Sequence, residues 1–290
     1  MTLFGGIEAG GTKFVCGMGD PDGGSRRTVR IPTTSPDETI GAALAFFRAA
    51  PEPLAAIGIA SFGPVDLDPA SPTYGRLLAT PKPGWAGVDL RGRIADGLGL
   101  PAGIDTDVNA AALAEARAAG DLRDLAYVTV GTGIGVGLIV GGQPVHGRGH
   151  PELGHIAPRR HPAHAGFAGT CPFHGDCLEG LASGTAIEAA WGAPLDALPS
   201  DHPAHAAITD YCAQLCATLL FATAPARIVL GGGVMTGGAL LPGIRRATAR
   251  KIASYLADCD EAALARRITA PLSHEPPGLI GAYLVGKSTG

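Results

Sequence analysis

The chain has 290 residues, of which 46% are hydrophobic and 17% are charged, and its formal net charge is −4 at pH 7. This length suffices for a full core, and the 44 glycines follow no three-residue period, which excludes a collagen-like or a disordered chain. Basic residues occur in no run longer than a pair, so we expect no nucleic-acid partner. The sequence has neither a signal-peptide pattern nor an apolar run of about 18 residues, so we expect no membrane contact and a cytoplasmic location.

The first predicted element is a hairpin with a glycine tip. Two short apolar runs, at residues 3–8 and 14–18, flank the turn as two strands would. Backbone amides in such a turn can point at an anion, because glycine adopts the required dihedral angles and lets phosphate oxygens approach closely. An ordinary hairpin turn explains the same residues, so this turn alone leaves both interpretations open. The turn residues are Gly10, Gly11, Thr12 and Lys13.

The next stretch predicts a helix, a buried strand and two loops. Ser35 followed by Pro36 is a typical helix start, and we expect this helix to run to about residue 50. The apolar residues 54–60 predict a strand, and the loop after it contains Gly63, at a place where α/β proteins bind ligands. A plain turn is the alternative there. Residues 69–83, rich in proline, serine and threonine, predict a mobile surface loop over a cleft.

Asp107 lies where a predicted strand at residues 102–104 leads into a predicted alanine-rich helix at 110–119. An aspartate before a helix can cap it, which contributes about 1 kcal/mol. The same carboxylate could act as a general base that accepts a proton from a bound hydroxyl group. Position in the sequence does not separate these two roles.

A second unit of strand, glycine turn and strand follows about 120 residues after the first. Residues 125–130 and 136–140 predict its strands. The repeat predicts an internally duplicated fold with one phosphate-facing turn in each lobe, and it favours nucleotide binding over two unrelated hairpins. The dinucleotide pattern GxGxxG is the rival interpretation, but here the chain continues as a strand rather than as a helix. The turn residues are Gly131, Thr132 and Gly133.

A third glycine run follows a predicted strand at residues 227–230. Such a turn could accept the flat face of a base or a ribose. A close crossing of a strand and a helix explains it equally well. The run consists of Gly231, Gly232 and Gly233.

The cysteines divide into two groups. Cys171, His174 and Cys177 share one short loop rich in glycine and proline, and His155 upstream can complete a set of four ligands. Two thiolates and two imidazoles are typical of a structural zinc ion, with no coordination position left for water. Packing is the alternative, but the loop lacks the apolar periodicity of a core element. The other four cysteines are interpreted as reduced core residues: Cys16, Cys212, Cys216 and Cys259, of which Cys212 and Cys216 have helical spacing.

With these residues in place, the chain resembles the ROK family of sugar kinases, and within it the bacterial fructokinases. The resemblance covers nearly the whole length, and the order of its motifs is more specific than any single motif. It implies an α/β fold of the duplicated, actin-like (ribonuclease-H-like) type, with two lobes and a structural zinc loop. It also implies an enzyme that uses ATP with Mg2+ to phosphorylate the 6-hydroxyl of a hexose, with fructose as the expected sugar. The motifs are GGIEAGGTKF, ASFGPVD, SPTYG with TPKPGW, DTDVNAAALAE, TVGTGIGVG, HPELGHI, CPFHGDCLEGLASG and RIVLGGGVM.

The resemblance also implies roles for individual residues. Asp107 matches the catalytic base, the first two glycine turns match phosphate-binding turns, and the third matches the adenosine turn. The expected sugar-binding residues are Thr106, Asp107, Glu152, His155 and Glu179, together with Gly63 from the loop described above. The expected ATP-binding residues are Gly10, Gly11, Thr12, Lys13, Gly131, Thr132, Gly133, Gly231, Gly232 and Gly233. The expected zinc ligands are His155, Cys171, His174 and Cys177.

Departures from the family pattern bear on the sugar. Many glucose-using relatives have Asp where Glu8 stands and Asn where Thr106 stands, and CPFHGDC replaces their C-x-C-G-x-x-G-C. Glucose is therefore not the expected sugar. A kinase for another hexose, mannose or glucose, and a non-catalytic sugar-binding regulator are the alternatives. DNA-binding members of the family carry a helix-turn-helix domain before the first strand, and this chain begins at that strand, so we do not expect a repressor.

We expect a small N-terminal α/β lobe at residues 1–108 and a large C-terminal α/β lobe at residues 109–290. The large lobe would contain the zinc loop, and its last helix could pack back on the small lobe. The expected partners are a small-molecule hexose and a second copy of the chain in a homodimer.

Overall fold

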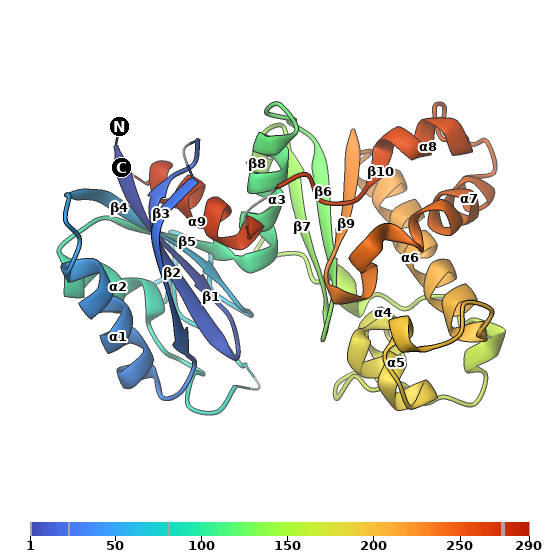
Figure 1. The fold of residues 1–290 in the computed structure, drawn as a ribbon, viewed down its shortest axis with the longest axis horizontal. Helices are drawn as coiled ribbons and strands as arrows, with labels where there is room; N and C mark the ends of the chain where they lie inside the picture. The colour runs from blue at the N-terminus through green and yellow to red at the C-terminus, as the bar shows by residue number, and fades with distance from the viewer. Residues whose placement is uncertain (1, 23, 81, 274–275, 290) are drawn as a thin grey trace. The chain divides into compact units, whose positions relative to one another are not determined.

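The computed structural model describes residues 2–22, 24–80, 82–273 and 276–289, and the chain forms two compact units (Figure 1). Unit 1 comprises Met1–Asp121, Pro144–Pro151 and Ser273–Gly290, and unit 2 comprises Leu122–Gln143 and Glu152–Leu272. The chain therefore leaves unit 1 twice and returns to it twice. The boundary expected at residue 108 falls within helix α3 (Asp107–Ala118), and helix α9 (Pro277–Lys287) belongs to unit 1.

Unit 1 is built on a five-stranded sheet in the order β3-β2-β1-β4-β5. β1 and β2 form the hairpin expected at the start of the chain, and β3 continues it as an antiparallel strand. β4 runs parallel to β1, and β5 runs parallel to β4. The bounds are Leu3–Ala9 for β1, Lys13–Asp20 for β2, Gly24–Pro32 for β3, Leu54–Ser61 for β4 and Ala102–Thr106 for β5.

Helices cover both faces of this sheet (Figure 1). On one face, Phe47 of α1 (Pro36–Arg48) and Ile94 of α2 (Leu90–Leu98) belong to one apolar cluster with the strands. On the other face lie α3 and α9, and Tyr283 of α9 is fully buried there. The backbones approach so closely that a Cβ on Gly58 would lie 1.7 Å from the carbonyl oxygen of Ala282. Only glycine fits at that position of β4, because it has no side chain.

The loop between β4 and α2, which we expected to be mobile, is anchored to unit 1 by buried side chains. Leu77 and Trp85 are fully buried, and Nε1 of Trp85 donates to the carbonyl oxygen of Thr34 at 2.9 Å. The Trp85 ring lies 5.3 Å from the ring of Phe14. The polar composition of the loop did not predict this anchoring, because only two apolar side chains are needed to hold the loop in place. Pro81 of this loop lies outside the described residues.

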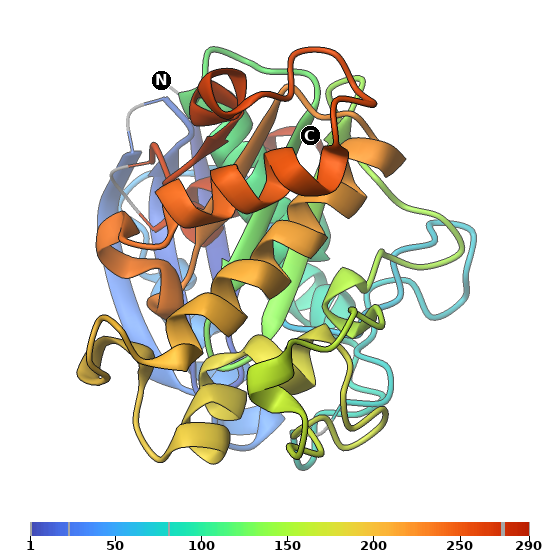
Figure 2. The same ribbon diagram turned by 90° about the vertical axis from the view of Figure 1, so that its right-hand side faces the viewer.

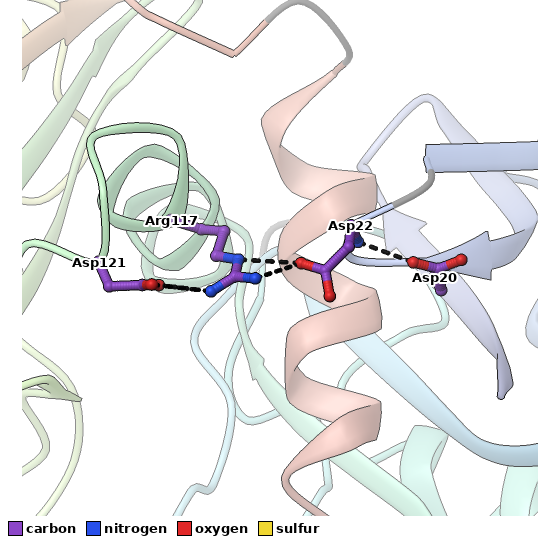
Figure 3. Close-up of polar contacts among 4 residues, drawn as sticks. All are labelled: Asp20, Asp22, Arg117 and Asp121. Atoms are coloured by element: carbon purple, nitrogen blue, oxygen red, sulfur yellow. Dashed lines mark hydrogen bonds and ion pairs between the residues drawn. The ribbon is translucent and has the colours of Figure 1, made fainter. Parts of the chain in front are cut away.

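An arginine joins the end of α3 to the turn between β2 and β3 (Figure 3). Nε of Arg117 donates to Asp22 at 3.0 Å, and Nη1 donates to both carboxylate oxygens of Asp121 at 2.8 Å. The Asp22 amide in turn donates to Oδ1 of Asp20 at 2.8 Å. Partly exposed ion pairs contribute at most about 1 kcal/mol each. The cluster therefore fixes local geometry more than it adds stability.

Unit 2 repeats the sheet of unit 1. Its order is β10-β9-β6-β7-β8, with β6 and β7 as an antiparallel hairpin and β9 parallel to both β6 and β10. β6 takes the place of β1, β7 that of β2, and β9 that of β4. The internal duplication predicted from the sequence is therefore confirmed. The bounds are Leu125–Val130 for β6, Ile134–Val140 for β7, Gln143–Pro144 for β8, Arg227–Gly231 for β9 and Ile268–Thr269 for β10.

The 20-residue helix α6 (Pro203–Ala222) packs against α7 (Leu241–Ile252), as Figure 2 shows. Cys212 and Cys216 are buried in α6, and burial raises the pKa of the Cys212 thiol to about 12. Both are therefore core residues, as predicted. α7 ends at Ile252, because Ala253 adopts the left-handed conformation with φ 51°. The remaining helices are α4 (Leu178–Ala182), α5 (Gly184–Trp191) and α8 (Glu261–Arg267).

None of the described helices combines the length and the apolar character that crossing a membrane requires.

Candidate active site

Unit 1 brings three predicted site segments to one edge of its sheet. In the register of the parallel strands, Ala9 pairs with Ser61, and Ser61 pairs with Thr106. These are the last residues of β1, β4 and β5, so the first glycine turn, the Gly63 loop and the start of α3 all leave the sheet at the same edge. Ligands bind at the carboxyl ends of parallel strands in α/β proteins. Gly10, Gly63 and Asp107 thus lie at the kind of edge where ligands bind.

The first glycine turn is closed by its own backbone and held by one threonine. The Gly10 amide donates to the carbonyl oxygen of Lys13 at 3.0 Å, and Oγ1 of Thr33 donates to the carbonyl oxygen of Gly10 at 2.7 Å. Gly11 and Thr12 are exposed, and a Cβ on Gly11 would meet no atom within 4 Å. Burial raises the pKa of the Glu8 carboxyl just before the turn, and the Lys13 ammonium opposes that shift. Among the described residues the tip of this turn is exposed, so an anion can reach it.

The N-cap of α3 is Thr106 and not Asp107. Thr106 has the extended backbone of a cap (φ −67°, ψ 153°), and its Oγ1 accepts from the Asn109 amide at 3.1 Å. Asp107 is the first helical residue, and its Oδ1 accepts from the Val108 amide at 2.9 Å. The cap interpretation of Asp107 is therefore wrong, because the cap is set by where the extended backbone ends. The carboxylate remains in the first turn, where the helix dipole favours negative charge.

A polar network that the residue pattern did not predict lies directly under this helix start. Asp105, only 4% exposed, accepts from the Thr106 amide at 2.7 Å and from Nδ2 of Asn109 at 2.8 Å, both through Oδ1. Its Oδ2 lies 3.0 Å from Nε2 of His146, and this hydrogen bond raises the pKa of His146. His150, four residues further, accepts from the Val65 amide at 3.4 Å. The sequence feature that could have predicted this network is an aspartate at the end of a buried strand. A buried carboxylate needs hydrogen-bond partners, but a local pattern does not identify them.

Unit 2 contains a cavity of about 700 Å3 beside the second glycine turn. Cavities that hold small molecules have volumes of about 300 to 1,000 Å3. This one is lined by the second turn, by the start of α5 and by the glycine-rich segment after β9. Sequence analysis identified Gly131, Thr132 and Gly233 among the lining residues, and missed Gly184, Thr185, Glu188, Asp196 and His205.

The second glycine turn is held from outside by α4 and α5. The Gly184 amide donates to the carbonyl oxygen of Gly131 at 2.6 Å, and Oγ1 of Thr185 donates to the carbonyl oxygen of Thr132 at 3.0 Å. Glu179 of α4 accepts from the Ile134 amide at 2.9 Å through Oε2. These contacts join the turn to residues about 50 positions later in the chain. Their sequence separation explains why spacing alone did not predict them.

The third glycine run makes a close backbone approach between two strands, and its role at a base or a ribose stays a prediction. Gly232 has φ 89°, and a Cβ there would lie 2.4 Å from the carbonyl oxygen of Val130. This close approach between the ends of β9 and β6 requires glycine. Gly233, the next residue, lines the cavity. Gly231 is the last residue of β9.

The predicted zinc ligands lie together. One ligand atom from each of the four residues lies within 4.8 Å of all the others. Nδ1 of His155 is 3.8 Å from Sγ of Cys171 and 3.5 Å from Sγ of Cys177, and Sγ of Cys171 is 3.6 Å from Nδ1 of His174. Tetrahedral zinc with ordinary bond lengths would place sulfur and nitrogen ligands about 3.6 Å apart. The donor set and its spacing therefore fit a structural zinc ion.

An arginine fastens the segment that carries these ligands. Arg160 donates to the carbonyl oxygen of His164 at 3.0 Å and also to that of Phe167. Its Nη2 donates to Asp176 at 2.6 Å, next to the ligand Cys177. The sugar-binding candidates of unit 2 lie on the same segment: Glu152 is exposed just before the short 3₁₀ helix Leu153–His155, and Glu179 is half-buried in α4.

Two sheets of identical strand order, each with a glycine turn at the carboxyl end of its first strand, define a duplicated α/β protein. The chain belongs to the ROK family, whose pattern matches residues 4–288. It is 43% identical over 289 residues to a fructokinase of Zymomonas mobilis, which covers 97% of this chain and 95% of that protein. It is 48% identical over 236 residues to a putative fructokinase of Bacillus subtilis, covering 80% of this chain and 78% of that protein.

The fold agrees with a solved member of the family. The structure of a ROK hexokinase from Thermus thermophilus superposes with a TM-score of 0.80 at 26% identity, covering 99% of this chain and 98% of that one. The mixed α/β fold with two sheets, expected from the resemblance, is therefore confirmed.

Proposed function

We propose that this chain is an ATP-dependent fructokinase that transfers the γ-phosphate of ATP to the 6-hydroxyl of D-fructose. The observation that carries the proposal is the 43% identity to a fructokinase over 97% of this chain. A sugar kinase is the class to which these relatives and the ROK family belong. The individual roles that follow are inferred from the geometry of each unit.

Asp107 is the general base in this proposal. Phosphoryl transfer requires chiefly that the acceptor oxygen is held in line and that charge is neutralised, with a carboxylate to take the proton of the hydroxyl group. Asp107 is only partly buried and is not needed as the cap of α3, since Thr106 has that function. Capping of α3 therefore does not account for its carboxylate, which we assign to the acceptor hydroxyl of the substrate. Thr106 and Gly63, at the same edge of the sheet, are assigned to sugar contacts.

The glycine turns are assigned to the nucleotide. The exposed tip of the first turn offers the amides of Gly11 and Thr12, with the Lys13 ammonium beside them. The cavity in unit 2 is assigned to the adenosine moiety, because it has the volume of a nucleoside site and polar groups from Glu188, Asp196 and His205. When bound, Mg2+ would neutralise phosphate charge.

Zinc is assigned to the cluster of His155, Cys171, His174 and Cys177. Four protein ligands make the ion structural, and it would stiffen the segment that bears the sugar-binding candidates. Nδ1 of His155 faces both thiols, so Nε2 is the nitrogen that we assign to a sugar hydroxyl. Oε2 of Glu179 accepts from Ile134, so Oε1 is assigned to the sugar. Glu152 is the third sugar-binding candidate.

The test is a sugar panel. ADP formation is measured with fructose, mannose, glucose and N-acetylmannosamine, and the position of the phosphate in the product is determined by NMR. We expect ADP only when a sugar is present, and a kcat/KM for fructose at least about 10-fold above those of the other sugars. A higher value for mannose or glucose would make the chain a kinase for another hexose. No turnover with any sugar that nevertheless binds would favour the regulator.

A homodimer is the assembly we propose. Light scattering of the purified chain measures it directly, and a monomer at micromolar concentration would contradict it.

A further inference from the structure

The segment 145–150 has no regular secondary structure, yet two of its histidines reach the ends of neighbouring strands in unit 1. His146 contacts Asp105 at the end of β5, and His150 contacts the Val65 amide in the loop after β4. β4 and β5 are paired in register up to Ser61 and Thr106. The segment therefore contacts the sheet at two points, both at the edge where α3 begins with Asp107.

We propose that His146 is a positioning residue for the phosphoryl transfer, acting through Asp105 to hold the first turn of α3 and, with it, the Asp107 carboxylate. The proposal rests on the proposed kinase function. It assigns no contact between His146 and substrate.

Asp105 is the link. Oδ1 accepts from the residue before Asp107, Thr106, and from Asn109 in the next turn. Oδ2 contacts His146 at 3.0 Å. Because both oxygens of a carboxylate lie on one rigid plane, a donor on Oδ2 also fixes the direction in which Oδ1 meets the helix. Nδ2 of Asn109 lies 3.5 Å from the same imidazole nitrogen, so both donors converge on the Asp105 carboxylate.

The bond can form in either charge state of His146. The imidazolium donates through both nitrogens, and the neutral ring donates from Nε2 in one tautomer. Asp105 is the charged group that faces the ring; the nearby Asn109 on α3 is neutral. The hydrogen-bond donor rather than the charge is thus the essential feature.

A positioning role and a purely structural role of His146 predict different effects on stability and on kcat, and the positioning role predicts the following. Asp105 is 4% exposed whereas the His146 side chain is 37% exposed, so loss of His146 lets water reach Oδ2 and keeps the carboxylate solvated. Little stability should be lost. The direction of Oδ1, and with it the start of α3, should loosen, and small displacements of a catalytic group lower kcat steeply.

The experiment compares three variants of the full chain in the sugar kinase assay. His146→Leu removes the donor and should lower kcat by about 10-fold or more with the KM for ATP within about 2-fold. His146→Gln places an amide donor near the position of Nε2 and should keep kcat within about 3-fold of wild type. His202→Leu is the matched control, since His202 accepts from the Ala204 amide at the start of α6 and lies far along the chain from Asp107. That control should lower Tm and leave kcat unchanged.

The outcomes separate the two proposals. A wild-type chain that phosphorylates no hexose would overturn the kinase assignment, and the positioning role would fall with it. An active wild type with an equally active His146→Leu variant would overturn the positioning role alone. Equal losses in His146→Leu and His146→Gln would also overturn it, because the donor would then not be what matters. A fall in Tm of His146→Leu beyond that of the control, with kcat unchanged at a temperature where it is folded, would leave only a structural role.

Discussion

The two units share one strand order but hold their candidate residues by different means. In unit 1, Gly10, Gly63 and Asp107 each lie within two residues of the carboxyl end of a sheet strand, so the sheet itself positions them. In unit 2, the segment from Glu152 to Glu179 contains only short helical turns, and it is held by side-chain contacts of Arg160 and by the Cys/His cluster. The position of a residue at a strand end is set by the pairing of the strands. The position of a residue on a long irregular segment depends on side-chain contacts, so variants in the two units should lose activity or stability for different reasons.

The largest effect is expected at the strand-end site of unit 1. Asp107→Asn should lower kcat by at least about 100-fold, the low end for loss of general-base help. The fold should survive, because Asn retains an acceptor for the Val108 amide and Thr106 still caps α3. Steady-state kinetics and thermal unfolding of the same preparation measure the two effects. Near-normal turnover would remove the catalytic assignment of Asp107.

A buried histidine in the irregular segment of unit 2 provides a test of how the packing of that segment contributes to stability. His164 is 1% exposed, its ring stacks on that of Trp191 at 4.3 Å, and its Nε2 has no hydrogen-bond partner among the residues that the structure describes. Burial lowers the pKa of His164 from 6.5 to about 4, with Arg160 as a second cause. Below pH 6.5 the unfolded chain therefore binds a proton that the folded chain does not. Stability is full at neutral pH and falls as the pH drops towards 4.

The His164→Phe variant should lose this pH dependence. At pH 5 the histidine costs about 2 kcal/mol of folding free energy relative to pH 7, and the phenylalanine costs nothing. Urea unfolding at both pH values, followed by tryptophan fluorescence, measures the difference. Parallel losses in wild type and variant between pH 7 and pH 5 would show that His164 does not titrate as a buried neutral group.

The cluster of His155, Cys171, His174 and Cys177 is the second group of contacts that holds this segment in place. Cys177→Ser should lose zinc and raise the KM for the sugar by about 10-fold, while the KM for ATP changes less, because the cluster lies on the segment with the sugar candidates. Elemental analysis and two-substrate kinetics measure these effects. Cys212→Ala is the control, since it removes a buried thiol of α6 and should retain the metal. A native protein without zinc, or an unchanged sugar KM in the zinc-free variant, would reduce the cluster to packing.

The smallest effects should distinguish the two glycine turns. A Cβ on Gly11 meets no protein atom within 4 Å, whereas one on Gly133 would lie 2.5 Å from Oε2 of Glu179. Gly11→Ala should therefore leave Tm unchanged and raise the KM for ATP about 5-fold, because only a bound phosphate needs the space. Gly133→Ala should displace Glu179 from the Ile134 amide, a hydrogen bond worth about 1 to 2 kcal/mol. Its Tm should fall by about 2 to 5 °C. The same Tm loss in both variants would contradict the difference between the turns.

Local patterns predicted the hairpins, the duplication and the cysteine and histidine cluster. Each of these features depends on residues that are close in the sequence or on a repeat, and both can be recognised in one sequence. The sequence left the cap role of Asp107 open, and the cap is Thr106, because the end of the extended backbone is set by pairing with Ser61 in another strand. The Asp105 network and the bracing of Gly131 by Gly184 join positions about 40 to 50 residues apart. Such contacts exist only in the fold, so residue types and spacing did not reveal them.

The place of α9 in unit 1 has a consequence for how the chain is made. α9 covers β4 so closely that Gly58 has no room for a side chain, yet it is synthesised after all of unit 2. During translation the apolar face formed by β1 and β4 therefore has α3 but lacks α9 while about 200 further residues leave the ribosome. Unit 2, which is complete once Leu272 has emerged, can fold first, and unit 1 closes only when the helix arrives. A ribosome-bound chain from which Leu272 has just emerged should have a second half that resists protease and a first half that does not.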